Sequence, residues 1–95
     1  MSVTEAVLLD LLGDGERFGL ELVATSEGRV KRGSVYVLLS RMEAKGFVES
    51  RQEERAPGAI GLPRRLYKTT PYGVTVRRAY QTLHQAIALK PAEAR

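Results

Sequence analysis

The sequence predicts a single domain that is mainly α-helical and carries a small β-ribbon. Three observations predict this class. Apolar residues recur at helical spacing in four segments, the period changes to that of strands between residues 47 and 69, and glycines and prolines separate the segments. The expected order is helix, helix, helix, strand, strand, helix. A chain of 95 residues has the length of one domain.

The composition excludes several classes of protein. Apolar residues make up 43% and charged residues 27% of the chain, which is typical of a folded domain and too apolar for a disordered one. The absence of cysteine excludes disulfides, thiolate metal sites and a thiol nucleophile. No segment has the pattern of a signal peptide or the roughly eighteen apolar residues of a membrane span. We therefore expect a cytoplasmic protein without membrane contact.

The charges are divided unevenly along the chain. Residues 1–28 hold six acidic residues and one arginine, a balance of −5, whereas the remaining residues hold fourteen Lys or Arg and five acidic residues, a balance of +9. Such a bipolar chain fits a surface that binds a polyanion and is supported by an acidic scaffold. Ordinary solvated basic surface is the alternative, and charge alone does not decide between the two.

The two N-terminal helices are short. Ser2 and Glu5 fit a capping box, in which each side chain accepts a hydrogen bond from the other residue's backbone N–H. The apolar residues that follow predict a helix that ends at the turn of residues 13–15. A second helix is expected from Phe18 to about Ser26. Its inward-facing residues and its closing glycine are Phe18, Leu22, Val23 and Gly28.

The third helix has the clearest pattern. It is expected to begin at Ser34 and to end at Gly46, which suits the left-handed position after a helix. Tyr36 and Arg41 lie on its flanks. The inward stripe recurs at i, i+3, i+4 and i+7 and consists of Val35, Leu38, Leu39 and Met42. The opposite face carries Val37, Ser40 and Ala44.

Two strands and a fourth helix follow. Residues 47–52 and 65–69 are predicted as strands on either side of a Gly/Pro-rich turn region, and together they form a β-ribbon. Thr70 and Pro71 begin the last helix as its cap and its first residue. Pro91 is expected to end this helix, before a frayed tail of residues 92–95. The helix carries a heptad-like seam that consists of Val76, Tyr80, Leu83 and Ile87.

This order of elements is typical of a winged helix-turn-helix, in which the third helix is the recognition helix and the ribbon is the wing. We expect residues 1–70 to form the DNA-binding part and residues 71–95 a dimerisation helix and tail, within one structural domain. A helix fits the major groove when one face is anchored in protein and the other offers short polar side chains and cations. The third helix has such a face, and the wing region from Arg51 to Lys68 carries five cations against two acids.

Three segments resemble the PadR-like transcriptional regulators. Residues 33–49, GSVYVLLSRMEAKGFVE, are similar to the family's recognition helix and following strand, G-S-L-Y-P-x-L-x-R-L-E-x-x-G-L-I-E. Residues 61–70, GLPRRLYKTT, resemble its wing pattern G-R-P-R-K-x-Y-x-L-T, and Gly73 matches the glycine that follows. Upstream, residues 18–22, FGLEL, are similar to the family's H-G-Y-E-L. The resemblance covers residues 5 to about 75 in the correct order and spacing.

The resemblance implies a winged-helix repressor that dimerises through its C-terminal helix and binds a palindromic operator. It also implies a small aromatic or planar effector, for which a cavity at the dimer interface near Tyr80 is the expected place, and no cofactor. The sequence departs from the family pattern at Arg32 and Val37, where prolines are usual, and at Leu20, where tyrosine is usual. Leu20 lacks the tyrosine hydroxyl, and with it one contact to phosphate or base.

Both the third helix and the wing are expected to contact double-stranded DNA. For Tyr36 the alternative is a roof over the core between the third helix and the wing. For Arg41 the alternative is a solvated arginine, or an ion pair with Glu43 or Glu49. For the wing arginines, Arg64 and Arg65, the alternative to DNA contact is ordinary surface charge. The predicted contacts are Ser34, Tyr36, Val37, Ser40, Arg41, Arg64 and Arg65.

The seam of the last helix is expected to join two copies of the chain across a two-fold axis. The first helix is too short to cover the whole seam, which favours a homodimer. Packing of the seam on the chain's own core is the alternative. The predicted interface residues are Val76, Tyr80, Leu83 and Ile87.

An enzyme is not expected. His84 is the only histidine, and we assign it neither catalysis nor metal binding. Glu53 and Glu54 are adjacent, so on a strand they point to opposite faces and cannot act as a paired acid and base. The chain has no P-loop and no dinucleotide fingerprint. Two other functions stay open: a winged-helix module for protein association without specific DNA binding, and a small-molecule-binding helical dimer without DNA affinity.

Overall fold

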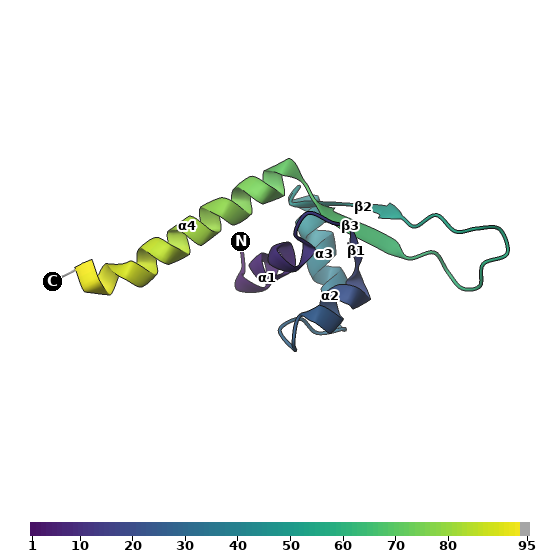
Figure 1. Ribbon diagram of the computed structural model, residues 1–95, viewed down its shortest axis with the longest axis horizontal. Helices are drawn as coiled ribbons and strands as arrows, with labels where there is room; N and C mark the ends of the chain where they lie inside the picture. The colour runs from purple at the N-terminus through teal and green to yellow at the C-terminus, as the bar shows by residue number, and fades with distance from the viewer. Residues whose placement is uncertain (94–95) are drawn as a thin grey trace.

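The computed structural model describes the backbone of residues 1–93 and the side chains of residues 1–87. Three helices and a small sheet form the body of the molecule, from which the wing and the last helix extend in opposite directions (Figure 1). The molecule measures 66 × 27 × 19 Å. Its elements are α1 (Val3–Leu12), β1 (Arg17–Phe18), α2 (Gly19–Thr25), α3 (Val35–Ala44), β2 (Val48–Gln52), β3 (Arg65–Thr69) and α4 (Pro71–Glu93).

The predicted class, mainly α-helical with a small β-structure, is confirmed. The core lies between α1, α2 and α3 and is closed by the sheet. Among the described residues, no helix has both the length and the hydropathy needed to cross a bilayer. The largest fully buried side chains of the core are Leu8, Leu9, Leu12, Leu22, Val35, Leu39 and Met42.

Helix α1 begins with the predicted capping box. The Ser2 hydroxyl accepts a hydrogen bond from the Glu5 N–H at 3.1 Å, and the Glu5 carboxylate accepts one from the Ser2 N–H at 2.9 Å. Glu5 is buried, and its other oxygen accepts a hydrogen bond from Lys45 Nζ at 2.8 Å. Burial by itself raises the pKa of Glu5, but Lys45 and Ser2 together hold this pKa below its ordinary value. One carboxylate thus caps α1 and ties it to the end of α3.

Removing the partner of Glu5 is expected to destabilise the fold in a pH-dependent way. Lys45→Met leaves the buried carboxylate without its ion pair and should lower the free energy of unfolding by about 1–3 kcal/mol at neutral pH. The folded-state pKa of Glu5 lies below the unfolded value of about 4.5, so the contribution is present above that value. It is lost as the pH falls through the folded-state pKa. Urea unfolding of both proteins at neutral pH and near pH 3 measures the change.

The control for this prediction is Lys31→Met, at an exposed lysine that has no ion pair among the described residues. It should leave the free energy of unfolding nearly unchanged at both pH values. A loss for Lys45→Met that is the same at neutral and acid pH would contradict the assignment to the Glu5 carboxylate.

The wing strands belong to a three-stranded antiparallel sheet with the order β1-β3-β2. Strand β2 pairs with β3 from Val48↔Thr69 to Gln52↔Arg65, close to the predicted ribbon. Strand β1 is an addition that the sequence did not predict, and it pairs with β3 about fifty residues further along the chain. A strand of two residues is too short to show the alternation of polar and apolar side chains from which strands are predicted. It forms only because the folded chain brings β3 beside it.

Because Phe18 belongs to β1, helix α2 begins at Gly19 rather than at Phe18, and it ends at Thr25. Phe18 therefore does not face the core from a helix, and it is only half-buried. The chain reverses direction after α2 through Glu27 and Gly28, which have φ values of 55° and 83°. Gly28 thus has its expected role just beyond the helix.

Helix α3 ends in the way that its sequence predicts. Gly46 has a φ of 83°, the left-handed conformation that follows a helix. Its N–H donates to the Glu43 carbonyl at 3.0 Å, and the Phe47 N–H donates to the Met42 carbonyl at 2.9 Å. This pair of bonds satisfies two carbonyls at the helix end and turns the chain directly into β2.

The start of α4 is fixed against the segment that follows α3. Thr70 Oγ1 caps the helix by accepting from the Gly73 N–H at 2.9 Å, and it donates to the Gly46 carbonyl at 2.6 Å. The Thr70 N–H donates to the Phe47 carbonyl at 3.0 Å. The direction of α4 is therefore set by the end of α3.

The other end of α4 corrects a prediction. The helix continues through Pro91 to Glu93 instead of ending at Pro91. A proline lacks one backbone donor, and near a helix end this loss affects only a single hydrogen bond. The predicted tail of residues 92–95 accordingly begins inside the helix, and residues 94–95 lie outside the described residues.

Candidate nucleic-acid interface

The outer face of α3 is turned to solvent because its inner face is anchored in the core. Val35, Leu39 and Met42 are fully buried. On the opposite side, the exposed fraction is 48% for Tyr36 and 53% for Val37. The structure brings all the predicted α3 contacts together on this exposed side, and they are Ser34, Tyr36, Val37, Ser40 and Arg41.

Two polar side chains of this face are not engaged elsewhere. Ser34 is the residue before the first turn of α3, but its side chain makes no capping hydrogen bond, which differs from the usual role of a serine at this place. Arg41 forms no ion pair with any carboxylate of the described residues, so the alternative of a pair with Glu43 or Glu49 is wrong. Glu43 instead accepts a hydrogen bond from Ser50 at 2.8 Å. Ser34 and Arg41 can therefore bind a ligand without breaking an internal contact.

Tyr36 has one packed side and one exposed side. Its ring lies so close to Gly19 that a Cβ built there would be 2.7 Å from Tyr36 Cε1. Leu20, at the position where tyrosine is usual in the resembled family, is 43% exposed nearby. Tyr36 also lines an open depression of about 270 Å³ between α3 and the wing. This wing-side depression is lined by Phe18, Leu20, Tyr36, Leu62, Arg64 and Arg65, among others.

The two predicted wing arginines are held in place by protein contacts. The Arg64 guanidinium donates to the Glu53 carboxylate through Nε at 3.2 Å and Nη2 at 3.0 Å, and it lies 3.9 Å above the Phe18 ring. The hydrogen bond from Arg64 is the main reason that the pKa of Glu53 is below its ordinary value. Arg65 Nη1 donates to Ser50 Oγ at 3.0 Å. A phosphate would therefore meet Arg64 already paired, and would have to compete with Glu53 for it.

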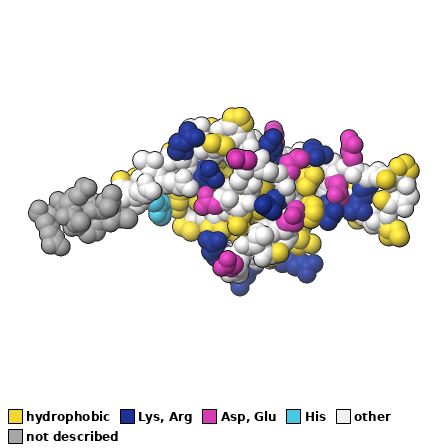
Figure 2. Space-filling view, viewed as in Figure 1, with side chains coloured by type: hydrophobic (Ala, Val, Ile, Leu, Met, Phe, Trp, Pro, Cys, Tyr) yellow, Lys and Arg dark blue, Asp and Glu magenta, His cyan; other side chains and the backbone are white. Residues whose placement is uncertain are grey.

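The wing carries charges along its length and exposed apolar groups at its tip. Figure 2 shows Lys and Arg side chains mixed with acidic ones along the wing, and hydrophobic side chains at its far end. The apolar residues of the tip region include Ile60 and Leu62, with exposed fractions of 93% and 87%. Arg55 Nη1 donates to the Ile60 carbonyl at 2.7 Å and steadies the turn.

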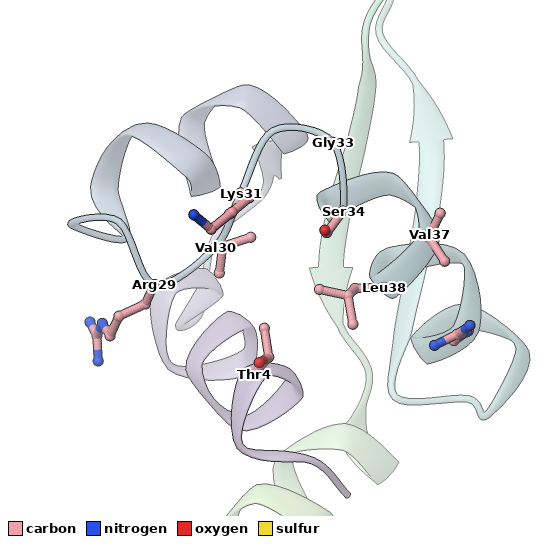
Figure 3. A pocket seen from close by; sticks show the side chains of 9 residues that line it. Thr4, Arg29, Val30, Lys31, Gly33, Ser34, Val37 and Leu38 are labelled. Atoms are coloured by element: carbon pink, nitrogen blue, oxygen red, sulfur yellow. The ribbon is translucent and has the colours of Figure 1, made fainter.

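A second depression borders α3 on the side away from the wing, and sequence reasoning missed it. Its volume is about 480 Å³, and the loop between α2 and α3 forms one of its walls (Figure 3). The signal that could have found it is the run of residues 29–32, which holds three cations in four positions just before the recognition helix. We call it the basic depression, and its lining includes Thr4, Arg29, Lys31, Ser34, Val37 and Arg41.

The seam of α4 divides into two parts. Val76 packs against the chain's own core, which for this residue agrees with the alternative to a dimer interface. Tyr80 is half-buried, and its ring centroid lies 4.4 Å from that of His84. Leu83 and Ile87, further along α4, are 58% and 59% exposed. The C-terminal part of α4 projects away from the body (Figure 1).

The sequence matches the model of the transcriptional regulator PadR-like family over residues 8–79. No curated protein is significantly similar to the chain in sequence. Among solved structures, a PadR family transcription regulator from hypervirulent Clostridium difficile aligns with a TM-score of 0.80 and 20% identity over 97% of both chains. A PadR-like transcriptional regulator from Bacillus cereus aligns with a TM-score of 0.76 and 22% identity, over 97% of this chain and 90% of that one.

A further similar structure is that of Bacillus subtilis PadR in complex with operator DNA. It aligns with a TM-score of 0.74 and 22% identity, over 85% of this chain and 48% of that one. At this level of identity the structural likeness establishes the shared fold, and this chain spans about half the length of that relative.

Proposed function

Since this chain belongs to the transcriptional regulator PadR-like family, whose model covers residues 8–79, we propose that it is a repressor that binds a palindromic operator as a homodimer. Its class is that of a transcription regulator and not of an enzyme. The observation that carries the proposal is the outer face of α3, where polar and cationic side chains stand exposed beside a charged wing. The complex of Bacillus subtilis PadR with operator DNA supports the same kind of partner for this chain.

In the proposed complex α3 lies in the major groove and the wing reaches the adjacent backbone. Side chains at the N-terminal part of a recognition helix contact base edges, and this chain offers Ser34 and Val37 there. On the same exposed side, Ser40 and Arg41 follow about one turn further along the helix. Arginine reads guanine through two hydrogen bonds, so Arg41 is the strongest candidate for base recognition. Arg64 and Arg65 contact phosphates or enter the minor groove, with Tyr36 between helix and wing.

The dimer forms through the projecting part of α4. Leu83 and Ile87 are large apolar side chains that the protomer leaves exposed, and Tyr80 lies about one turn before Leu83 and two turns before Ile87. A two-fold axis between two paired copies of α4 is expected to place the two copies of α3 about 34 Å apart, which matches half-sites one DNA turn apart. Val76 contributes to the protomer core rather than mainly to the partner.

Repression follows in this proposal from occlusion of a promoter by a cytoplasmic protein. A small aromatic or planar effector would bind between the two α4 helices near Tyr80 and change the spacing of the recognition helices. Such a ligand would stabilise the dimer by an amount that grows with the logarithm of its concentration above the dissociation constant, and thermal melting with candidate compounds can measure this.

Selection of bound sequences from random duplex DNA tests the proposal directly. The expected result is a palindromic consensus with two half-sites, and an affinity that falls steeply with salt because bound cations release counterions. Enrichment of a single asymmetric site would overturn the palindromic dimer. Absence of any retained duplex at low salt would favour the protein-association module, or, if small molecules raise the melting temperature, the ligand-binding dimer.

Arg41→Ala is expected to weaken binding to the selected operator by about 1–3 kcal/mol and to relax the consensus at one position per half-site. The reason is that Arg41 is exposed on α3 and has no carboxylate partner among the described residues. Fluorescence anisotropy with operator and random duplexes measures both affinities. Arg77→Ala is the matched control and should keep both affinities, because Arg77 lies on α4, outside α3 and the wing, and is paired with Asp10 at 3.7 Å. Equal operator affinity for wild type and Arg41→Ala would remove Arg41 from the interface.

A further inference from the structure

The outer face of α3 has a depression on each of its two flanks. The wing-side depression includes Tyr36, whereas the basic depression includes Ser34, Val37 and Arg41. Figure 3 shows the basic depression bounded by Thr4 at the start of α1, by the loop before α3, and by α3 itself. A recognition helix in a major groove has a phosphate backbone on each side. The wing borders the flank of α3 that carries Tyr36, so in the proposed complex it faces one of these two backbones.

The loop that forms one wall of the basic depression is held in a single shape by a buried serine. Ser26 is fully buried, and its hydroxyl accepts from the Val30 N–H at 3.1 Å and lies 2.8 Å from the Val23 carbonyl. The Ser26 carbonyl accepts from the Arg29 N–H at 3.2 Å and from Arg29 Nε at 3.1 Å. The cations on this loop are therefore positioned before any ligand arrives, which lowers the entropic cost of binding.

The cations around the basic depression have no carboxylate partner among residues 1–87. Arg29, Lys31 and Arg41 line it, and none of the three forms an ion pair with a carboxylate of the described residues. The first turn of α3 adds the positive end of its helix dipole, with the uncapped Ser34 hydroxyl beside it. The Arg29 Nε contact with Ser26 leaves the other guanidinium nitrogens available. Such a group of donors suits an oxyanion that carries negative charge on several oxygens.

We propose that the basic depression binds a backbone phosphate of the duplex whose major groove α3 occupies, on the strand opposite to the one that the wing contacts. The inference rests on the proposed function, and it adds Lys31 and Arg29 as residues that position the protein on DNA without reading its sequence. Together with the wing it gives α3 one anchor on each side, which fixes the depth and tilt of the helix in the groove.

The experiment measures the salt dependence of DNA binding for wild type, Lys31→Gln and Arg77→Gln. Lys31→Gln should weaken binding to the selected operator and to a random duplex by the same factor. It should also reduce the slope of log affinity against log salt by about 1, the value for one lost phosphate contact. Arg77→Gln removes the same charge from a residue of α4 that lies outside α3, its preceding loop and the wing and is paired with Asp10 at 3.7 Å, so it should keep the wild-type slope.

The possible outcomes separate this inference from the proposed function. If wild type binds duplex DNA and Lys31→Gln keeps its slope, this inference fails while the proposed function stands. If wild type binds no duplex DNA, the proposed function fails, and this inference fails with it. Melting without DNA, in inorganic phosphate and in chloride at equal ionic strength, tests a free anion as the occupant. Phosphate stabilisation that Lys31→Gln abolishes, combined with an unchanged slope on DNA, would assign the depression to a free anion and overturn the proposal.

Discussion

Replacing Gly73 by alanine is expected to lower the free energy of unfolding by about 3 kcal/mol. Alanine is the better helix former by about 1 kcal/mol, so helix propensity alone predicts the opposite sign. The structure reverses this expectation, because a Cβ at Gly73 would collide with the backbone carbonyl oxygen of Phe47 and lie 2.8 Å from Thr69 Cγ2. Since the first obstacle is backbone, it cannot move aside as a flexible side chain can.

The first turn of α4 must therefore shift in Gly73→Ala, and two contacts shift with it. These are the Thr70 hydrogen bonds to Gly46 and Phe47, which connect α4 to the end of α3. Urea unfolding monitored by circular dichroism measures the loss. Gly15→Ala is the matched control, since nothing lies within 4 Å of a Cβ built at Gly15. A denaturation midpoint for Gly73→Ala at or above that of wild type would contradict the prediction. It would show that the chain accommodates the new methyl group beside the Phe47 carbonyl without loss of stability.

Local patterns account for the parts of the fold that were predictable from the sequence. The capping box of Ser2 and Glu5 and the glycine end of α3 each depend on residues within one or two helical turns, so their sequence patterns suffice. Strand β1 and the Glu5–Lys45 ion pair join residues far apart in sequence. Nothing in their neighbourhood marks them, and only the folded chain brings the partners together.

The candidate interface also contains parts that follow from local sequence patterns and parts that depend on contacts between distant residues. The exposed face of α3 follows from a helical period of 3.6 residues, and the structure places Ser34, Ser40 and Arg41 where that period puts them. The basic depression could not be derived in this way, because the position of Arg29 and Lys31 depends on the loop that buried Ser26 holds. The pairing of wing arginines with neighbouring side chains likewise depends on strand register, which the sequence leaves open.

Leu83→Glu is expected to convert the proposed homodimer into a folded monomer. Burying one leucine side chain contributes about 1.5–3 kcal/mol, and a two-fold interface would bury both copies. The dissociation constant should therefore rise by a factor of roughly 10² to 10⁴, before the cost of burying the new carboxylate is added. In the protomer Leu83 is 58% exposed, so the substitution should leave the thermal stability of the monomer nearly unchanged.

The surroundings of Leu83 support a helix as the partner. The side chain borders an open, mainly apolar depression of about 570 Å³ on α4. Small side chains allow close approach of a second helix along this face, and they are Thr75, Ala79, Thr82 and Ala86. Helix α4 has 23 residues and so a length of about 35 Å, which carries it well beyond the body (Figure 1).

Sedimentation velocity of wild type, Leu83→Glu and Leu62→Glu measures this effect. Leu62→Glu makes the same chemical change at a wing residue that is 87% exposed, and it should remain a dimer. Operator binding should fall sharply for Leu83→Glu, because each α3 then binds its half-site without the help of the other. A Leu83→Glu protein that still sediments as a dimer would move the interface off this face of α4, and a wild-type monomer would remove the dimer from the proposed mechanism.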